Sequence, residues 1–280
     1  MNYVTEHQKD LERIAKMRLM DDVFMSCCLN DNIPAMELIL GIILGRTLQV
    51  IRVTGQAHLK NLHGRSVTLD ALAIDESGKY YDVEVQRDDR GATPQRSRYH
   101  SSMMDADMLK PGDKWKDLHD SYVIMITEND VLGLGLPIYT IERCITNSDK
   151  LKIFNDGSHI IYVNSGIQDD TPLGKLMHDF YCTRADDMHY QVLADQVRYH
   201  KEKGVGEMCS IVEEIRREAA AKATAKAAKA AAKAAKEAAK RYREMALRMI
   251  ESGKLTDEEI AHISGLSLME IKRLAGEMSA

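Results

Sequence analysis

The sequence predicts an α/β fold in which helices flank a mixed central sheet, followed by a long Ala/Lys-rich helix and a small C-terminal helical hairpin. Three observations support this fold class. Short β-branched runs alternate with helical patterns, residues 216–241 contain only Ala, Thr224 and charged residues, and two helix-start signals lie near the C-terminus. We therefore expect a domain at 1–210, a helical arm at 211–250 and a tail at 251–280.

The first part of the chain is predicted to form helices and then strands. Residues 1–45 have apolar residues at helical spacing, and Pro34 suits the first turn of a helix. A strand is expected at 49–53. Two more strands are expected at 69–87, where Glu76–Lys79, with one Gly, separates two apolar runs as in a β-hairpin.

The elements after the hairpin alternate in the same way. A helix is expected at 93–110, with Pro94 near its start and Lys110-Pro111-Gly112 at its end. The apolar run at 122–126 is short and β-branched, which predicts a strand buried on both faces. Further strands are expected at 138–141 and 160–163, and helical patterning resumes from 173 and continues, with breaks, past 212.

The hairpin brings acidic side chains together. Because side chains alternate along a strand, Asp82, Glu84 and Gln86 share one face, and folding about the turn places Asp70 within about one residue of the position opposite Glu84. Two carboxylates this close repel each other unless a cation or a proton lies between them. Such oxygen ligands suit Mg²⁺ or Mn²⁺. The alternative is a solvated hairpin edge whose charges discourage aggregation.

The surrounding sequence resembles a known nuclease family. Asp70 with Glu84-Val85-Gln86 resembles the PD-(D/E)XK signature, with Gln in place of the usual Lys. The likeness is to one branch, the PD-(D/E)XK family transposases related to the recombination-promoting nucleases, and it extends over roughly residues 15–215. The matching segments are 20–25, 64–70, 81–87, 96–99, 133–139 and 159–164.

The resemblance implies a restriction-endonuclease-like fold and Mg²⁺-dependent hydrolysis of DNA phosphodiesters, with Mn²⁺ as a substitute. It implies that Asp70, Glu84 and the backbone carbonyl of Val85 ligate the metal. Gln86 takes the catalytic position of the family's Lys, but an amide carries no positive charge, so it is expected to orient water or a phosphate oxygen. We expect Gln86→Lys to be tolerated, since it restores the commoner residue.

The resemblance also suggests residues outside the hairpin. Asp22 is expected as a further metal ligand from the first helices, with Asp21 and Glu37 as rivals. Arg98 and Tyr99 resemble family positions that face the cleft and would contact DNA. Their alternative is a surface ion pair and a half-buried aromatic side chain.

Two histidines next to these segments are not expected to take part. His100 stands where another Tyr is expected, a departure with little expected effect on the metal site. His63 is interpreted as a loop residue and not as a general base. The ten His form no HxxxH or HxH pair and the five Cys lack zinc-site spacing, so a zinc enzyme is disfavoured.

The arm and the tail carry their own signals. Between residues 216 and 248, six Lys and five Arg face only three Glu, an excess of eight positive charges in a chain of net charge −5. The lysines predicted to contact DNA phosphates lie within an arc of roughly 80°; they are Lys222, Lys226, Lys229 and Lys233, continued by Lys236 and Lys240. The alternative is an exposed semi-rigid spacer.

The tail repeats one helix-start pattern. Thr256–Glu259 and Ser267–Glu270 each fit a capping box, with Gly265 between the two predicted helices. This arrangement resembles a helix-turn-helix element. The alternative is a helical hairpin used for packing or self-association, through which the protein would form a homo-oligomer.

These observations together predict a cytoplasmic protein without a membrane span, since the longest apolar run, 39–44, is too short. The expected function is that of a metal-dependent DNA endonuclease acting in transposition or recombination of a mobile element. Two alternatives remain open. One is a DNA-binding protein of the same fold with weak or lost cleavage, and the other is a defence or toxin-type nuclease.

Overall fold

The computed structural model describes residues 2–147, 150–203 and 205–278. The description does not include the side chains of residues 2–7, 203, 205–219, 221, 222, 225, 277 and 278. Lys222, which is predicted to contact DNA, is one of these residues. Contacts within the chain divide it into two compact units, residues 1–210 and 211–280.

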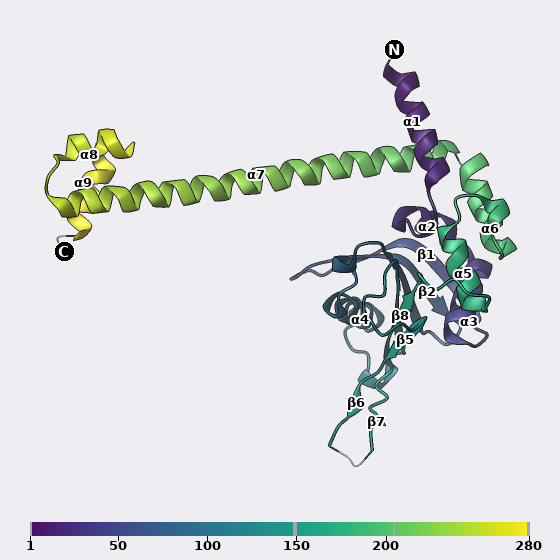
Figure 1. The fold of residues 1–280 in the computed structure, drawn as a ribbon. Helices are drawn as coiled ribbons and strands as arrows, with labels where there is room; N and C mark the ends of the chain where they lie inside the picture. Colours follow the sequence, from purple (N-terminus) through teal and green to yellow (C-terminus); the bar gives the residue numbers. More distant parts are fainter. Residues whose placement is uncertain (1, 148–149, 204, 279–280) are drawn as a thin grey trace. The chain divides into compact units, whose positions relative to one another are not determined.

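The first unit is built on a six-stranded mixed sheet with the strand order β1-β2-β3-β4-β8-β5 (Figure 1). Strands β1 to β3 are antiparallel neighbours, β3, β4 and β8 run parallel, and β5 is antiparallel to β8. The strands are β1 (Val50–Leu59), β2 (Val67–Asp75), β3 (Tyr80–Gln86), β4 (Ser121–Thr127), β5 (Ile138–Ile141) and β8 (Ser158–Asn164). This is the mixed central sheet that the sequence predicts.

Helices cover both faces of this sheet. Figure 1 shows α4 (Pro94–Met108) on one face and α2 (Asp22–Leu29), α3 (Ile33–Leu44) and α5 (Pro172–Tyr181) on the other. All seven residues of β4 are buried, as predicted for a strand covered on both sides. The remaining elements of the unit are α1 (Asn2–Lys16), η1 (Asp89–Gly91), η2 (Trp115–Asp117), η3 (Ala185–Asp187), α6 (Gln191–Arg198) and a π-helical turn, η4 (Tyr199–Lys203).

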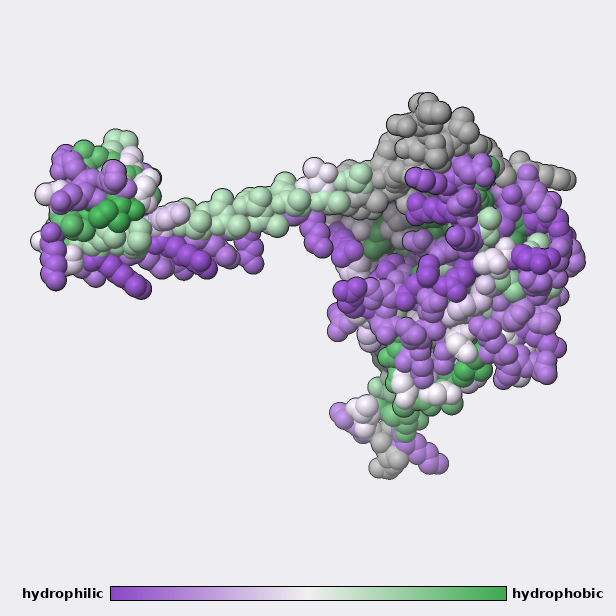
Figure 2. Space-filling view, turned by 45° about the horizontal axis from the view of Figure 1, so that its top comes forward, coloured by the Kyte–Doolittle hydropathy of each residue, from purple (hydrophilic) through white to green (hydrophobic). Residues whose placement is uncertain are grey.

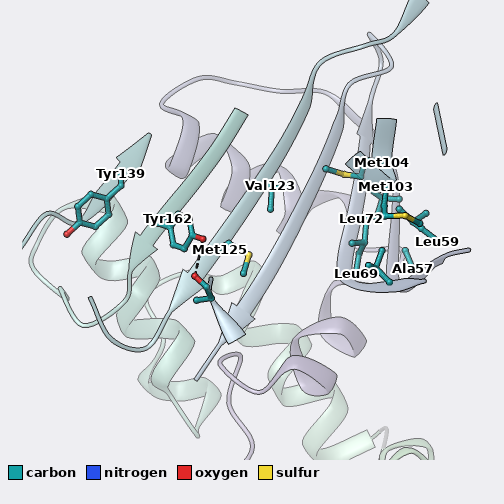
Figure 3. Close-up of a cluster of buried hydrophobic side chains, with 12 residues drawn as sticks. Ala57, Leu59, Leu69, Leu72, Met103, Met104, Val123, Met125, Tyr139 and Tyr162 are labelled. Carbon is teal, nitrogen blue, oxygen red and sulfur yellow. Dashed lines mark hydrogen bonds between the residues drawn. The ribbon is translucent and has the colours of Figure 1, made fainter. Parts of the chain in front are cut away.

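One side of the sheet and α4 share an apolar core. Figure 3 shows Leu69 and Leu72 of β2 beside Met103 and Met104 of α4, with Val123 and other core residues on the neighbouring strands. Fully burying each such side chain contributes roughly 1.5–3 kcal/mol. This packing fixes α4 against the hairpin formed by β2 and β3.

On the opposite face, a glycine lets α2 approach β1. A Cβ atom added at Gly55 would lie 2.4 Å from the carbonyl oxygen of Ser26, so only glycine fits there. Ser26 in turn donates through its Oγ to the carbonyl oxygens of Asp22 or Asp70, each 2.7 Å away. The N-terminal turn of α2 is therefore held beside the middle of β2.

The sequence underestimates β1, which reaches Leu59 and not residue 53. Gly55 and Gln56 (φ +49°) break the apolar alternation, yet pairing with β2 continues on both sides of them. Two short strands, β6 (Cys144–Ile145) and β7 (Lys152–Ile153), also escape prediction because two residues carry no period. Among the helices that the structure describes, none alone is long and apolar enough to cross a membrane, and only the pair α2 and α3, bent by 116°, meets those criteria jointly.

The long helix and the hairpin predicted at the C-terminus are both present. Helix α7 (Val205–Ser252) continues into the second unit, where α8 (Asp257–Ser264) and α9 (Leu268–Met278) pack on its end through Ala246, Ile260, Ile271 and Leu274. Both capping boxes form: Thr256 exchanges hydrogen bonds with Glu259, and Ser267 with Glu270. Figure 2 shows hydrophilic side chains along one side of α7 and the Ala surface along the other.

Candidate active site

Asp70 and Glu84 lie opposite each other on β2 and β3. The antiparallel register ends with the pair of Ala71 and Val83, so Asp70 and Glu84 occupy the next position along the two strands, as the hairpin geometry predicts. The backbone N–H of Asp70 donates to Oε1 of Glu84 at 2.8 Å, and the backbone N–H of Val85 donates to Oδ2 of Asp70 at 3.1 Å. The two carboxylates are thus fixed by the backbone of the neighbouring strand.

These carboxyls are buried next to a third one. The exposed fractions are 6 % for Asp70 and 0 % for both Glu84 and Asp82. Burial, together with the charge of Glu84, raises the pKa of Asp70 to about 8. Burial and the charge of Asp82 raise the pKa of Glu84 to about 8. Burial and the charge of Asp70 also raise the pKa of Asp82 far above its ordinary value.

The third carboxyl has one oxygen without a hydrogen-bond partner in the described part of the chain. Among the residues that the structure describes, Oδ1 of Asp82 is buried and has no hydrogen-bond partner. An unsatisfied buried oxygen costs about 1–3 kcal/mol. This unsatisfied oxygen and the raised pKa values indicate a cluster of hard oxygen donors that a nearby cation would stabilise.

A hydrogen-bonded chain connects this cluster to α4. Nε of Arg96 donates to Nε2 of His100 at 3.3 Å, so the other ring nitrogen carries the proton and donates to Oδ2 of Asp82 at 2.9 Å. Burial lowers the pKa of His100, which agrees with a neutral ring. The sequence analysis expects His100 to have little effect on the site, whereas the structure places its Nδ1 also 3.8 Å from Oε1 of Glu84.

Arg96 contacts both Glu84 and Gln86, and the sequence analysis gave Arg96 no role in the site. Its guanidinium donates to Oε2 of Glu84 at 2.7 Å and to Oε1 of Gln86 at 3.0 Å. Gly91 makes room for this arrangement, because an added Cβ would lie 2.1 Å from Oε1 of Gln86. The i, i+4 spacing of Arg96 and His100 on a predicted helix was the signal that could have found the pair.

The three acids proposed from the first helices are placed differently. The negative charge of Asp22 raises the pKa of Asp70, so Asp22 lies close enough for the two carboxyls to interact. Asp21 is bound by Arg87 at 2.7 Å. Glu37 accepts a hydrogen bond from the backbone N–H of Val50 at 2.9 Å, which gives it a structural role. Of the three acids, Asp22 is therefore the one whose charge acts on Asp70.

A basic pocket lies beside the carboxyls. It has a volume of about 770 Å³, is lined by His100 and Tyr99, and contains four arginines, Arg65, Arg90, Arg96 and Arg98. Arg98 is exposed in this pocket, while the hydroxyl of Tyr99 donates to the carbonyl oxygen of Arg65 at 2.6 Å. Arg98 and Tyr99 therefore line the pocket and not the cluster of carboxyls itself.

The remaining predicted DNA contacts lie on the part of α7 that belongs to the second unit. Lys226, Lys229 and Lys233 are exposed. His63 is exposed, as expected for a loop residue.

Comparison with known protein families matches residues 38–166 to a family described as PD-(D/E)XK nuclease family transposase. The matched region contains Asp70, Glu84 and Gln86 as well as Arg96 and His100. No significant match was found among curated proteins or among solved structures.

Proposed function

Since residues 38–166 match the PD-(D/E)XK nuclease family transposases, we propose that this protein is a divalent-metal-dependent DNA endonuclease acting in transposition or recombination of a mobile element. The observation that carries the proposal is the buried pair Asp70 and Glu84. They lie on adjacent strands, burial raises the pKa of both, and the charge of Glu84 raises that of Asp70 further. A pair of this kind costs stability unless a cation joins it.

The donors present fit a hard divalent cation. Asp70 and Glu84 offer carboxylate oxygens, the carbonyl of Val85 is proposed as a third donor, and Asp22 as a further acid. Oxygen-only donor sets suit Mg²⁺, with Mn²⁺ as the substitute. When bound, the ion would lower the pKa of a water ligand and offset negative charge on the scissile phosphate.

Arg96 supplies the positive charge that Gln86 lacks. Its guanidinium holds one oxygen of Glu84, which leaves Oε1 of Glu84 on the side of Asp70. The same guanidinium fixes the oxygen of Gln86, so the amide N–H₂ of Gln86 is the group left to donate to water or to a phosphate oxygen. In this arrangement Gln86 orients the water or the phosphate oxygen, and Arg96 provides the positive charge.

The pocket lined by Arg65, Arg90, Arg96 and Arg98 provides the surface for the DNA backbone. Its volume of about 770 Å³ and its arginines suit phosphate groups, which arginine binds through paired N–H donors. We propose that Arg98 and Tyr99 act here in binding and not in the chemical step. The exposed lysines of α7 would add a contact that carries no sequence preference, and the α8–α9 hairpin would serve DNA binding or self-association.

A plasmid-nicking assay tests the function. Wild-type protein is expected to nick supercoiled DNA with Mg²⁺ or Mn²⁺ and not with a chelator present. Asp70→Ala and Glu84→Gln should each reduce cleavage by at least 100-fold, on the order of the loss when a group that stabilises the transition state is removed. The matched control is Glu76→Gln, an exposed acid at the turn of the same hairpin. Equal nicking by all four proteins would refute the proposal.

A further inference from the structure

A second group of metal-binding side chains lies outside the family-matched region, where α5 ends and α6 begins. His178 and Asp179 lie in the last turn of α5, Cys182 is its C-cap residue, and His189 precedes α6. On a helix, residues four apart share a face. His178 and Cys182 therefore point to the same side of the helix end, and the chain returns to them at His189.

The donor atoms of these side chains lie close together. Nδ1 of His178 lies 3.4 Å from Oδ1 of Asp179 and 3.6 Å from Sγ of Cys182. Tetrahedral zinc, with Zn–N and Zn–O bonds of about 2.0–2.1 Å and a Zn–S bond of about 2.3 Å, separates N and O ligands by about 3.4 Å and N and S ligands by about 3.6 Å. The two distances from His178 thus match those of atoms that share one zinc ion, and all three donor atoms lie within 4.8 Å of one another.

His189 lies beside these three side chains and would supply a fourth ligand by turning its ring toward the ion, while Asp179 is held in place. The ring of His189 lies 4.8 Å from the ring of His178, centroid to centroid. Asp179 is fully buried, and its two oxygens accept the backbone N–H groups of His189 and Tyr190 at 2.8 Å each. These bonds fix the carboxylate and leave lone pairs on each oxygen, as carboxylates bound to metals usually have.

The site is also accessible to an ion. The side chain of His178 is 40 % exposed, while Cys182 is 8 % exposed. Without a metal, the thiol of Cys182 donates to the carbonyl oxygen of Asp187, 3.6 Å away. A metal that binds there displaces that proton to solvent as the metal–sulfur bond forms.

We propose that His178, Asp179, Cys182 and His189 bind one Zn²⁺ ion in a site separate from Asp70 and Glu84. Thiolate and imidazole ligands select Zn²⁺ over Mg²⁺. One thiolate and one carboxylate offset the two charges of the ion. Four protein ligands leave no open position, which makes the site structural and not catalytic.

The site would stabilise the corner that supports α2. The backbone N–H of Met20 donates to the carbonyl oxygen of Phe180 at 3.1 Å, two residues before Asp22. Zinc at the end of α5 would therefore order the segment 182–190 and the start of α2 together. The spacing His-x3-Cys-x6-His is neither an HxxxH pair nor a Cys pair, which is why zinc-site spacing in the sequence does not reveal it.

Metal analysis and cobalt substitution test this site. Protein purified without an affinity tag or chelator is expected to hold about one Zn²⁺ per chain, as a closed four-ligand site does. The Co²⁺-substituted protein should show tetrahedral d–d bands and a thiolate-to-cobalt charge-transfer band. Cys182→Ser should remove the charge-transfer band, whereas the matched control Cys144→Ser and the active-site variant Asp70→Asn should keep it.

A further variant guards against misfolding. His189→Gln, checked for an unchanged circular dichroism spectrum, should lose at least ten-fold in zinc affinity, within the range for removing a group from a metal site. A charge-transfer band that persists in Cys182→Ser would overturn the proposal. Folded His189→Gln with wild-type affinity, or wild-type protein with far less than one zinc per chain, would overturn it as well.

Discussion

Asp70→Asn should make the metal-free protein more stable at neutral pH. Asp70 ionises near pH 3.9 in the unfolded chain, whereas burial and the charge of Glu84 raise its pKa to about 8 in the fold. Between these values the folded protein keeps a proton that the unfolded chain has lost. The free energy of unfolding therefore falls as pH rises through this window, and it falls no further above the folded pKa.

The size of the effect follows from the width of that window. Neutral pH lies about three units above the unfolded pKa, and each unit corresponds to about 1.4 kcal/mol, which sets a ceiling of about 4 kcal/mol. Asn cannot ionise, yet its oxygen can still accept the N–H of Val85. We expect a gain of about 2–4 kcal/mol at pH 7, or roughly 5–15 °C in Tm for a protein of this size, and no gain near pH 4.

Differential scanning fluorimetry at both pH values, with and without Mg²⁺, measures this. Mg²⁺ at 100 times its Kd should stabilise wild-type protein by about 2.7 kcal/mol and Asp70→Asn hardly at all. Glu76→Gln, the exposed acid on the same hairpin, should behave as wild type in every condition. The reasoning fails if Asp70→Asn is less stable than wild type at pH 7, or if Mg²⁺ raises both melting temperatures equally.

Two further predictions concern Gln86 and the α7 lysines. Gln86→Lys should reduce cleavage and Tm, contrary to the sequence-based expectation, because the Lys ammonium would repel the Arg96 guanidinium, which now lies 3.0 Å from the Gln86 oxygen. The double variant Gln86→Lys/Arg96→Gln should recover part of the loss. No recovery would refute the contact. Replacing Lys226, Lys229 and Lys233 by Gln should flatten the salt dependence of duplex binding by about 0.9 for each lysine that binds a phosphate. An unchanged slope would make α7 a spacer.

The pairing of Asp70 with Glu84 could be predicted from the sequence because it depends on local rules. A short turn with one Gly fixes the register of the hairpin, and the period of two then decides which side chains meet. The capping boxes of α8 and α9 were predictable for the same reason. Each is formed within four consecutive residues.

Contacts between distant elements could not be predicted in this way. Arg96 and His100 reach Glu84 and Asp82 only because α4 packs against the hairpin, and nothing in the sequence alone fixes that docking. Asp82 was recognised as sharing the face of Glu84 but was given no role, since its burial depends on α4 as well.

Anomalous diffraction from crystals grown with Mn²⁺ and a short DNA duplex tests the central claim most directly. The account predicts a manganese peak within bonding distance of one carboxylate oxygen each of Asp70 and Glu84, about 2.0–2.3 Å, in wild-type crystals and not in Glu84→Gln crystals. DNA bound in the pocket lined by Arg65 and Arg98, with manganese absent from these carboxylates or retained unchanged in Glu84→Gln, would contradict it.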